Sequence, residues 1–416
     1  MIVSVIGLGY IGLPTAAVLA SNEIKVIGVD VNQQTIDTIN SGRIHIIEPG
    51  LDVLVSEAVK KGYLKAVIKP QKADIFMIAV PTPLGNGNKP DLSYVKSAAK
   101  AIAPVLEKGN LVILESTSPV GTTEKLTMWM RDERSDISFP EFGNNNFLAD
   151  IAVAHCPERV LPGKVLRELI ENNRIIGGIS DNCARQAKDL YKIFVHADSL
   201  LTDSRTAELC KLVENSFRDV NIAFANELSL ISDKLGVNVW NLIKLANQHP
   251  RVNILQPGPG VGGHCIAVDP WFISDSAPNE SKLIQTARLV NDNKPNFVID
   301  KINKSVKAIG RNRSDIKIVC LGLSFKPDID DLRESPALEI ALKIRLMGFS
   351  ELMLVEPNIS NIPSELKHES VRLSSFEKAI KASDIVVLLV DHTPFKSIDL
   401  NELSGKQIID TRGTWS

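Results

Sequence analysis

The sequence lacks an excess of charge of either sign. Its 416 residues include 47 Lys and Arg against 49 Asp and Glu, a formal net charge of −2. This balance gives no general attraction to nucleic acid or to anionic membranes, so we expect neither as a partner, and an anionic ligand must be bound by a local cluster of cations. With 44% hydrophobic and 23% charged residues, the composition is typical of a soluble globular enzyme. The length favours two or three domains.

The sequence also lacks paired cysteines and metal-ligand spacing. Its five cysteines are scattered, without a C-x-x-C pair, at Cys156, Cys183, Cys210, Cys265 and Cys320. An odd number so widely separated argues against a disulfide framework and favours a reducing cytoplasm. The histidines considered as metal ligands together with these cysteines, His155, His249 and His264, do not have the spacing of zinc ligands. We therefore expect no metal.

The first twenty residues, MIVSVIGLGYIGLPTAAVLA, are apolar but lack the basic segment of a signal peptide, since the first charged residue after the start is Glu23. Gly7, Gly9, Gly12 and Pro14 interrupt the run, which argues against a membrane span. A buried strand that enters a tight turn and a helix accounts for the same residues.

Strand and helix patterns alternate along the first part of the chain. Apolar runs at 2–9, 24–30, 73–80 and 110–117 predict strands, and 10–21 and 94–109 predict helices. Alternation of this kind predicts a parallel sheet covered on both faces. The polar stretch 131–146 is interpreted as a loop.

The C-terminal part repeats this pattern, with strands expected at 316–323, 351–357, 383–390 and 406–413 and a helix at 336–348. Its second strand carries Glu356 at its end, as 24–30 carries Asp30. Between the two parts, 204–236 has helical periodicity and a stop at Gly236. A single helix there would be about 45 Å long and could connect the domains and form a dimer surface. A set of shorter helices is the alternative.

The predicted fold is therefore α/β, with two Rossmann-like doubly wound domains joined by a long central helix. We expect an N-terminal Rossmann-like domain at 1–200, a central helical domain at 201–305 and a C-terminal Rossmann-like domain at 306–416.

The stretch GLGYIG, residues 7–12, has the dinucleotide fingerprint between a strand and a helix. Gly7 permits the turn, Gly9 lets the pyrophosphate approach the backbone, and Gly12 allows close packing of helix and strand. Asp30 follows eighteen residues after Gly12, and no arginine comes directly after it, which favours NAD over NADP. A glycine turn that serves packing alone is the alternative. Thr82, Thr117 and Thr123 follow later strands and could contact cofactor or water, or could be turn residues.

The stretch PGPGVGGHCIAVDP, residues 257–270, places Cys265 after a glycine-rich loop and four residues before Asp269. Backbone N–H groups of such a loop can stabilise a thiolate, which favours a nucleophile over a buried apolar cysteine. Asp269 followed by Pro270 could also cap a helix. A nucleophilic cysteine beside NAD predicts oxidation of a primary alcohol to an aldehyde, capture as a thiohemiacetal, oxidation to a thioester and hydrolysis to a carboxylate, with two NAD consumed.

Lys211, Asn215 and Arg218 are spaced four and three residues apart, so they lie on one face of the central helix. This face could line the cleft and supply a base and an oxyanion partner, or it could be an ordinary solvated surface.

The chain resembles the nucleotide-sugar 6-dehydrogenases of the UDP-glucose/UDP-N-acetylhexosamine group over essentially its whole length. The resemblance rests on GLGYIGLPTA, VPTP, LESTSPVGTTEK, CPERVLPG, RTAELCKLVENSFRDVNIAFANE, HPRVNILQPGPGVGGHCIAVDPWF, GLSFKPDIDDLRESPA and DTRG. It implies a C-terminal domain that binds UDP and a uronic acid product destined for a surface polysaccharide. The long apolar-striped helix at 204–236, rather than the resemblance, favours a homodimer, with a higher oligomer as the alternative.

The resemblance also implies roles for individual residues. The catalytic set would be Cys265 as nucleophile, Lys211 in proton transfer, and Glu158, Asn215, Asp269 and Thr117 around the hydrolytic water. NAD would contact Gly7, Gly9, Tyr10, Ile11, Gly12, Asp30, Thr82, Thr123 and Arg333. Arg333 would reach either the NAD of its own chain or that of a neighbouring subunit. The sugar nucleotide would contact Arg159, Val160, Lys211, Asn215, Arg218, His249, Arg251, Gly262, Phe325, Lys326 and Arg412.

One departure distinguishes the branches of this group. His264 precedes Cys265, and Ala267 and Val268 precede Asp269, where the glucose branch tends to have serine and lysine. The loop resembles the N-acetylhexosamine branch, and the overall resemblance favours UDP-N-acetylmannosamine, with UDP-N-acetylglucosamine as the alternative. A hydroxyacid dehydrogenase that transfers a single hydride and a non-catalytic sensor are other functions compatible with an NAD fold.

Overall fold

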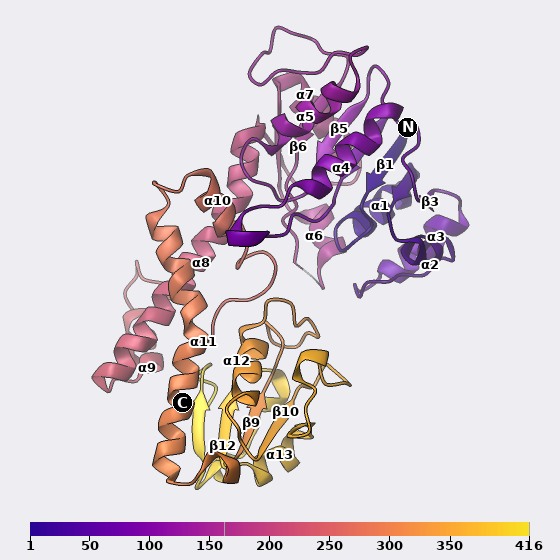
Figure 1. Cartoon of the computed structure of the whole chain (residues 1–416). Helices are drawn as coiled ribbons and strands as arrows, with labels where there is room; N and C mark the ends of the chain where they lie inside the picture. Colours follow the sequence, from indigo (N-terminus) through magenta and orange to yellow (C-terminus); the bar gives the residue numbers. More distant parts are fainter. Residues whose placement is uncertain (162, 416) are drawn as a thin grey trace. The chain divides into compact units, whose positions relative to one another are not determined.

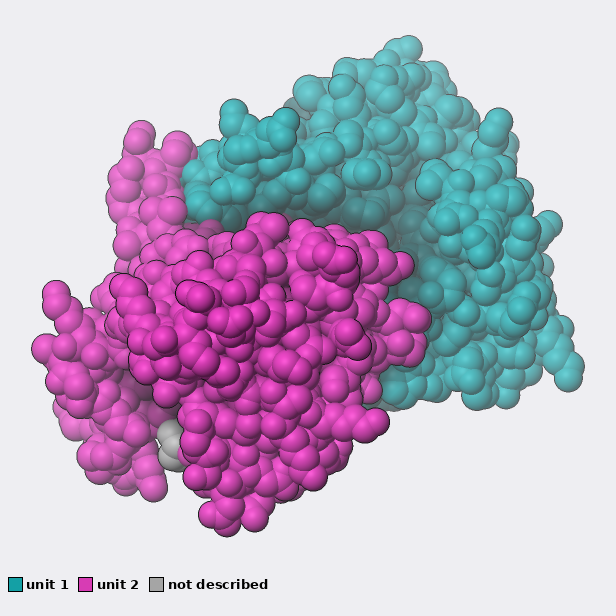
Figure 2. All heavy atoms as spheres, turned by 60° about the horizontal axis from the view of Figure 1, so that its bottom comes forward, with its two compact units in different colours: residues 1–214, 271–277 teal, residues 215–270, 278–416 magenta. Residues whose placement is uncertain are grey.

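The computed structural model describes residues 1–161 and 163–415, and the chain divides into two compact units (Figure 2). Unit 1 comprises residues 1–214 and 271–277, and unit 2 comprises residues 215–270 and 278–416. Each unit has its own sheet and its own hydrophobic core. The long helix α8, Ser204–Leu235, begins in unit 1 and ends in unit 2.

The described residues of unit 1 form a sheet with the strand order β3-β2-β1-β4-β5-β6-β7-β8 (Figure 1). The strands are β1 Ile2–Ile6, β2 Lys25–Val29, β3 Leu64–Val67, β4 Ile75–Ile78, β5 Leu111–Leu114, β6 Ala152–His155, β7 Arg174–Gly178 and β8 Ser199–Asp203. Every residue of β4, β5 and β6 is buried, because helices cover both faces of the sheet.

The helices of unit 1 are α1 Gly12–Ser21, α2 Gln33–Asn40, α3 Leu51–Lys60, α4 Ser93–Ile102, α5 Thr122–Glu133, α6 Val165–Glu171 and α7 Asp181–Tyr191. Nine of the ten residues of α1 are buried, which explains its small and apolar composition. Pro14 lies in the first turn of α1, where a missing N–H group breaks no hydrogen bond of the helix. The apolar N-terminal stretch is therefore a strand, a turn and a core helix.

The helices of unit 2, after α8, are α9 Val239–Ala246, α11 Lys282–Ile309, α12 Pro336–Arg345 and α13 Phe376–Ala382. The short helix α10, Asp269–Ser276, begins in unit 2 and continues into unit 1. The sheet has the order β11-β10-β9-β12-β13, with all neighbours parallel. Its strands are β9 Lys317–Leu321, β10 Glu351–Val355, β11 Val371–Leu373, β12 Ile385–Leu388 and β13 Gln407–Asp410.

Alternate residues of β9 pack on opposite faces of this sheet. Ile318 and Cys320 belong to the cluster that includes residues of α11 and α12, whereas Val319 and Leu321 belong to the cluster that includes residues of α13. Burial raises the pKa of the Cys320 thiol, so this cysteine is an apolar core residue. Figure 1 shows α11 running beside β13 in unit 2.

The predicted fold class is confirmed, with one departure in the sheet of unit 1. Strands β6 and β7 pair antiparallel, with Ala154 opposite Gly178, so the expectation of a purely parallel sheet is wrong at this junction. The sequence alternation extended only to β5, and an antiparallel strand near the edge of a parallel sheet is common. The stretch 204–236 forms one continuous helix that ends before Gly236, which has a φ of +69°. In 131–146, helix α5 extends to Glu133 before the irregular segment begins.

Candidate active site

The GLGYIG turn connects β1 to α1 at the carboxyl edge of the unit 1 sheet. Gly7 has a φ of +91°, and a Cβ atom there would lie 2.6 Å from the Ala79 carbonyl oxygen. A Cβ atom at Gly12 would lie 1.8 Å from the Gly7 carbonyl oxygen. Both glycines are therefore required by the close approach of backbone segments within the protein.

Gly9 differs from these two glycines, because a Cβ atom there would meet nothing within 4 Å. Its φ is not positive, so the protein alone gives no reason for glycine at this position. The first turn of α1 accepts no side-chain cap, and an anion at such a helix start is stabilised by the backbone N–H groups. Half-exposed Ile11 is the residue before the helix, and exposed Tyr10 precedes it. This open helix start fits a dinucleotide pyrophosphate.

Asp30 follows β2 and is half-buried beside the turn. Its Oδ2 accepts a hydrogen bond from the Leu8 N–H group at 3.0 Å, and its Oδ1 accepts one from Asn32 at 2.9 Å. These bonds fix the carboxylate at the end of the second strand, where it can accept hydrogen bonds from a ribose. The turn, the open helix start and Asp30 together fit NAD.

Two of the three predicted threonines are joined directly. The Thr82 hydroxyl donates to the Thr117 carbonyl oxygen at 2.6 Å, and both residues are half-buried. This bond connects the segments that follow β4 and β5 at the carboxyl edge of the sheet.

Thr123 is buried at the start of α5 and donates through both its N–H group and its hydroxyl to Glu208 Oε1, at 2.7 and 2.6 Å. The other carboxylate oxygen of Glu208 accepts the Gly121 N–H group at 2.6 Å. Burial raises the pKa of Glu208 to about 7, although these donors act in the opposite direction. Glu208, on α8 and three residues before Lys211, therefore caps the first turn of α5. No sequence motif had indicated this role.

Glu158, of the CPER stretch after β6, is buried in unit 1 with only 7% of its surface exposed. Its Oε1 atom has no hydrogen-bond partner among the described protein residues. A buried carboxylate oxygen without a partner fits a position reserved for water or substrate. Nearby polar groups are also buried: burial raises the pKa of Glu115 to about 7, while Arg174 and the Tyr191 hydroxyl oppose the shift.

Arg159 follows Glu158 and is held by Glu214, with Nε at 3.0 Å from Oε2 and a second nitrogen at 2.5 Å from Oε1. This paired geometry orients the guanidinium within unit 1. Val160 is half-buried. Lys211 is half-buried on α8, and its ammonium group makes no hydrogen bond or ion pair with a described residue.

Cys265 is exposed and belongs to unit 2. Its carbonyl oxygen accepts hydrogen bonds from Val268 at 3.1 Å and from Asp269 at 2.9 Å, so residues 265–269 form one tight turn. Asp269 is 3% exposed, and its Oδ2 accepts a hydrogen bond from the Asn215 side chain at 2.5 Å. This turn brings Cys265, Asp269 and Asn215, three of the predicted catalytic residues, together in unit 2.

The glycine loop before Cys265 packs against other parts of unit 2. A Cβ atom at Gly262 would lie 2.4 Å from the Glu334 carbonyl oxygen, and one at Gly263 would lie 3.0 Å from the Phe325 ring. One at Gly258 would lie 2.6 Å from the Arg412 guanidinium. The glycines therefore allow residues 257–265, the thiol loop, to pack against the residues predicted to hold UDP. The sequence alone did not reveal this reason for the glycines.

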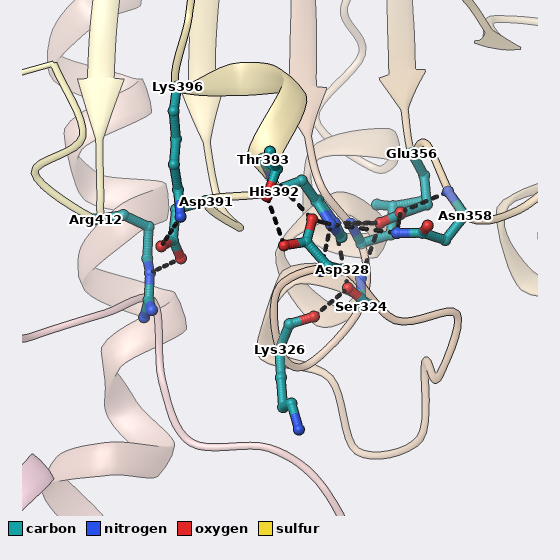
Figure 3. A network of polar contacts seen from close by, with 11 residues as sticks. Ser324, Lys326, Asp328, Glu356, Asn358, Asp391, His392, Thr393, Lys396 and Arg412 are labelled. Atoms are coloured by element: carbon teal, nitrogen blue, oxygen red, sulfur yellow. Dashed lines mark hydrogen bonds and ion pairs between the residues drawn. The ribbon is translucent and has the colours of Figure 1, made fainter. Parts of the chain in front are cut away.

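Phe325, Lys326 and Arg412 line one small pocket of about 20 Å³ in unit 2, together with Gly260 of the thiol loop. Lys326 is exposed, and Arg412 Nε donates to Asp391 Oδ1 at 2.8 Å (Figure 3). Asp391 also pairs with Lys396 at 3.5 Å. The structure thus brings together the three residues predicted for the UDP end.

The remaining predicted residues are exposed in unit 2. Arg218 lies on α8, and His249 Nδ1 accepts the Arg251 N–H group at 3.3 Å in the segment after α9. Arg333 is bound to Asp331, with Nε at 2.9 Å from Oδ1 and a second nitrogen at 2.6 Å from Oδ2. This ion pair connects the Arg333 side chain to Asp331, two residues earlier in the same loop.

The predicted catalytic residues are thus divided between the units. Thr117, Glu158 and Lys211 belong to unit 1, and Asn215, Cys265 and Asp269 belong to unit 2. Among the described residues, no group of three or more His, Cys, Asp or Glu could hold a metal ion. No helix in the described part of the chain is long and apolar enough to cross a membrane.

Models of three domains of one family match the chain. They are the NAD-binding domain of the UDP-glucose/GDP-mannose dehydrogenase family at residues 1–195, its central domain at 205–293 and its UDP-binding domain at 319–416.

Similar curated proteins cover nearly the whole chain. A UDP-N-acetyl-D-mannosamine dehydrogenase of Campylobacter jejuni is 60% identical over 403 residues, 96% of this chain and 98% of that protein. An NDP-N-acetyl-D-galactosaminuronic acid dehydrogenase of Ralstonia solanacearum is 59% identical over 415 residues, 100% of this chain and 96% of that protein.

A solved structure, a UDP-D-ManNAc dehydrogenase from Pyrococcus horikoshii, matches with a TM-score of 0.88 and 40% identity, covering 100% of this chain and 96% of that one. The three domain models span most of the chain in order, and the relatives are similar over its full length. The chain is therefore an NAD-dependent oxidoreductase that belongs to the UDP-glucose/GDP-mannose dehydrogenase family.

Proposed function

We propose that this protein oxidises C6 of UDP-N-acetyl-D-mannosamine to a carboxylate, with two NAD reduced per sugar. The observation that carries the proposal is the contact between the thiol loop and the UDP pocket in unit 2. Gly263 lies against Phe325, which lines the pocket with Lys326 and Arg412, and the exposed Cys265 follows two residues later. A nucleotide diphosphate bound over Phe325, Lys326 and Arg412 at the mouth of that pocket would place the attached sugar within reach of the thiol.

Cations on the described residues of unit 2 can hold the nucleotide end. Lys326 and Arg412 would bind the diphosphate, and Phe325 would pack against the uridine. Arg218, His249 and Arg251 are exposed and available for the sugar nucleotide. Arg159 and Val160 of unit 1 and Gly262 of unit 2 would complete this lining. These assignments give a neutral protein a local cluster of positive charge for its anionic substrate.

The first oxidation needs a group that takes the alcohol proton and stabilises the alkoxide. NAD, when bound, accepts a hydride in each of the two oxidations. Lys211 would interact with the C6 oxygen, because its ammonium group is not used by another described residue. The product of this step is an aldehyde at C6.

The second half of the reaction would use the turn at 265–269. The Cys265 thiolate would attack the aldehyde to form a thiohemiacetal, whose oxidation gives a thioester. Asp269, positioned by Asn215, would then direct a water molecule at the thioester carbon, with Glu158 and Thr117 as further water ligands. Attack of water breaks the carbon–sulfur bond, releases the carboxylate and returns the thiol. Overall, the alcohol, two NAD⁺ and water give the carboxylate, two NADH and three protons.

The sugar proposed as substrate is chosen from the names of similar proteins. UDP-N-acetyl-D-mannosamine dehydrogenase is the name of relatives from Campylobacter jejuni and, at 55% identity, Escherichia coli. The Ralstonia relative is named for N-acetyl-D-galactosaminuronic acid and is equally similar. The N-acetylgalactosamine nucleotide is therefore a second candidate substrate, and UDP-N-acetylglucosamine is the alternative from the loop resemblance. A surface polysaccharide would receive the uronate, and a cytoplasmic location would supply the NAD.

The test is a substrate panel with UDP-N-acetylmannosamine, UDP-N-acetylgalactosamine, UDP-N-acetylglucosamine and UDP-glucose. NADH and uronate are measured together, and we expect two NADH per uronate with the mannosamine nucleotide preferred. A ratio of one NADH per sugar would remove the thioester mechanism. Cys265→Ala should abolish steady uronate formation, whereas Cys183→Ala, a buried cysteine in α7, should not.

We also propose that the chain forms a homodimer through α8. Phe217, Phe224 and Ile231 are spaced seven residues apart and are 68%, 53% and 45% exposed. Such spacing places them on one side of the helix, and a large exposed apolar stripe is typical of an interface. Arg333 could then reach the NAD of the neighbouring subunit. Phe224→Glu should give a monomer in light scattering, and a wild-type protein that is monomeric at micromolar concentration would contradict the proposal.

A further inference from the structure

Unit 2 contains a second cavity, of about 240 Å³, that none of the residues proposed above lines. It lies between α8, α9, α11 and the end of β13. The lining residues that matter for its chemistry are Ser229, Asp233, Trp240, Lys294, Lys301 and Thr411. The cavity is therefore separate in its residues from the pocket of Phe325, Lys326 and Arg412.

Lys294 is a buried cation in the wall of this cavity. Only 4% of its surface is exposed, and its Nζ donates a hydrogen bond to Ser229 Oγ. No carboxylate oxygen of a described residue lies within 4.0 Å of Nζ. An ammonium group has three donors, so this contact leaves two N–H groups without a hydrogen-bond acceptor among the described residues. A buried charge without a counter-ion is costly, and a ligand that brings the opposite charge relieves that cost.

The other charged groups of the cavity already have partners. Asp233 is bound by Lys301 at 2.7 Å and by Lys304 at 3.4 Å. Asp410 accepts the N–H groups of Arg412, Gly413 and Trp415. Burial lowers the pKa of Lys294 to about 7, and the nearby charge of Lys301 lowers it further, while Asp233 opposes the shift. Lys294 is thus the ammonium group in the lining of the cavity that no described carboxylate pairs with.

The size and lining of the cavity indicate a ring compound. A cavity of roughly 150 Å³ accommodates benzene, so 240 Å³ is enough for a ring with a substituent. Trp240 supplies an aromatic surface, whereas the ammonium groups of Lys294 and Lys301 already lie over the Phe297 ring, 4.5 and 5.3 Å from its centre. Ser232 offers a hydroxyl group, and the Thr411 hydroxyl, which donates to the Leu388 carbonyl oxygen at 2.7 Å, can still accept a hydrogen bond.

We propose that this cavity binds a small ring compound with one carboxylate, and that the carboxylate pairs with Lys294. A single negative charge balances the single uncompensated cation. A doubly charged phosphate would bring its second charge near Asp233 and Asp410, both of which line the same cavity.

The probes are benzoate, its neutral isostere benzamide and inorganic phosphate, with binding measured by isothermal titration calorimetry on the full chain. We expect benzoate to bind wild type at least about tenfold more tightly than benzamide or phosphate, the loss expected when one charged hydrogen bond is missing. Lys294→Met should weaken benzoate binding by a similar factor. Lys307→Met is the matched control, because it removes an exposed lysine of the same helix α11 that does not line the cavity, and it should change binding by less than about threefold.

The wild-type titrations decide the proposal even if Lys294→Met fails to fold. Equal binding of benzoate and benzamide, no benzoate binding at tens of millimolar, or a preference for phosphate would each overturn it. A crystal structure grown with benzoate should show the ring beside Trp240. A cavity filled by residues of the protein itself or of a second copy would also overturn the proposal.

Discussion

The two glycines at positions 9 and 12 offer a direct test of how the GLGYIG turn serves NAD. Gly9→Ala adds a methyl group that meets nothing within 4 Å, in a backbone conformation that alanine can adopt. We expect the free energy of unfolding to stay the same or to rise by about 0.4–1 kcal/mol, because alanine has less conformational freedom in the unfolded chain. The methyl group would instead occupy the space through which the pyrophosphate approaches the backbone. NAD binding should weaken by roughly ten- to a hundredfold, or about 1.4–2.7 kcal/mol.

Gly12→Ala should have the opposite profile. Its methyl group would lie 1.8 Å from the Gly7 carbonyl oxygen and 3.3 Å from a Val5 methyl group. Both atoms belong to the β1 strand and its turn, so they cannot move away without shifting the strand or α1. Overpacking of this kind costs about 1–3 kcal/mol and more where backbone must move, so we expect a loss of at least about 3 kcal/mol in the free energy of unfolding.

The assay combines urea unfolding without ligand and NADH binding followed by nicotinamide fluorescence, for wild type and both variants. The reasoning requires the two effects to separate: affinity changes at Gly9 and stability changes at Gly12. A Gly9→Ala protein that binds NADH normally would show that the open space at position 9 is not used by the cofactor. Equal destabilisation by the two substitutions would show that the contacts described for Gly12 are not what distinguishes them.

Two further predictions concern buried charges. Glu208 has a folded pKa of about 7, above its usual 4.5, so its contribution to stability is fully present below pH 4.5 and is lost as the pH rises through 7. Glu208→Gln removes this titration. As the pH rises from 4.5 to 8, the free energy of unfolding of the variant minus that of wild type should therefore increase by up to about 3 kcal/mol, measured in urea titrations. A difference that does not change with pH would contradict the effect of burial on Glu208. Arg288→Met would leave Asp219, which is 0% exposed, without its ion pair at 2.6 Å, and should cost about 3–5 kcal/mol. Arg288→Met combined with Asp219→Asn should recover part of that loss, measured by urea unfolding; no recovery would show that packing rather than charge is responsible.

Local patterns were sufficient to predict the first β-α-β unit and its place in an NAD-binding domain. Gly7, Gly12 and Asp30 lie within thirty residues, and their requirements follow from one turn and two adjacent strands. The same reasoning identified β9, β10, β12 and β13 of unit 2, because each contains a short apolar run. It missed β11, Val371–Leu373, which has an exposed arginine at its centre and no apolar run.

Residues that act across long sequence separations could not be predicted in this way. Glu208 caps α5 through Gly121 and Thr123, which are 87 and 85 positions earlier in the chain. One signal was available: buried Ala207, Leu212 and Asn215 share the inward face of α8 with Glu208, and a charged residue on such a face needs a partner. The identity of that partner depends on tertiary structure alone.

The glycine loop shows a second limit of local reasoning. A run such as PGPGVGG is compatible with close approach of a ligand or of the protein itself, and the sequence interpretation favoured the ligand. In the structure, Gly262 and Gly263 are approached by Glu334 and Phe325, some seventy and sixty residues later in the chain. The loop therefore positions Cys265 by packing within unit 2, and the nearness of Cys265 to the pocket of Phe325, Lys326 and Arg412 follows from that packing.

The two Rossmann-like sheets also explain why a repeated pattern need not bind the same ligand twice. Gly322 and Glu356 in unit 2 correspond to Gly7 and Asp30 in unit 1. Both glycines have φ near +90°. In each unit the leucine after the glycine, Leu8 or Leu323, donates its N–H group to the carboxylate. Glu356, however, is 5% exposed, and its Oε2 lies 3.0 Å from Nε2 of the fully buried His392 (Figure 3). The imidazole occupies the position beside the carboxylate that a ribose would need. Within the described residues, Asp30 accepts hydrogen bonds from the N–H groups of Leu8 and Asn32 and has no such imidazole beside it, so the same turn is open to a dinucleotide in unit 1 and closed to it in unit 2.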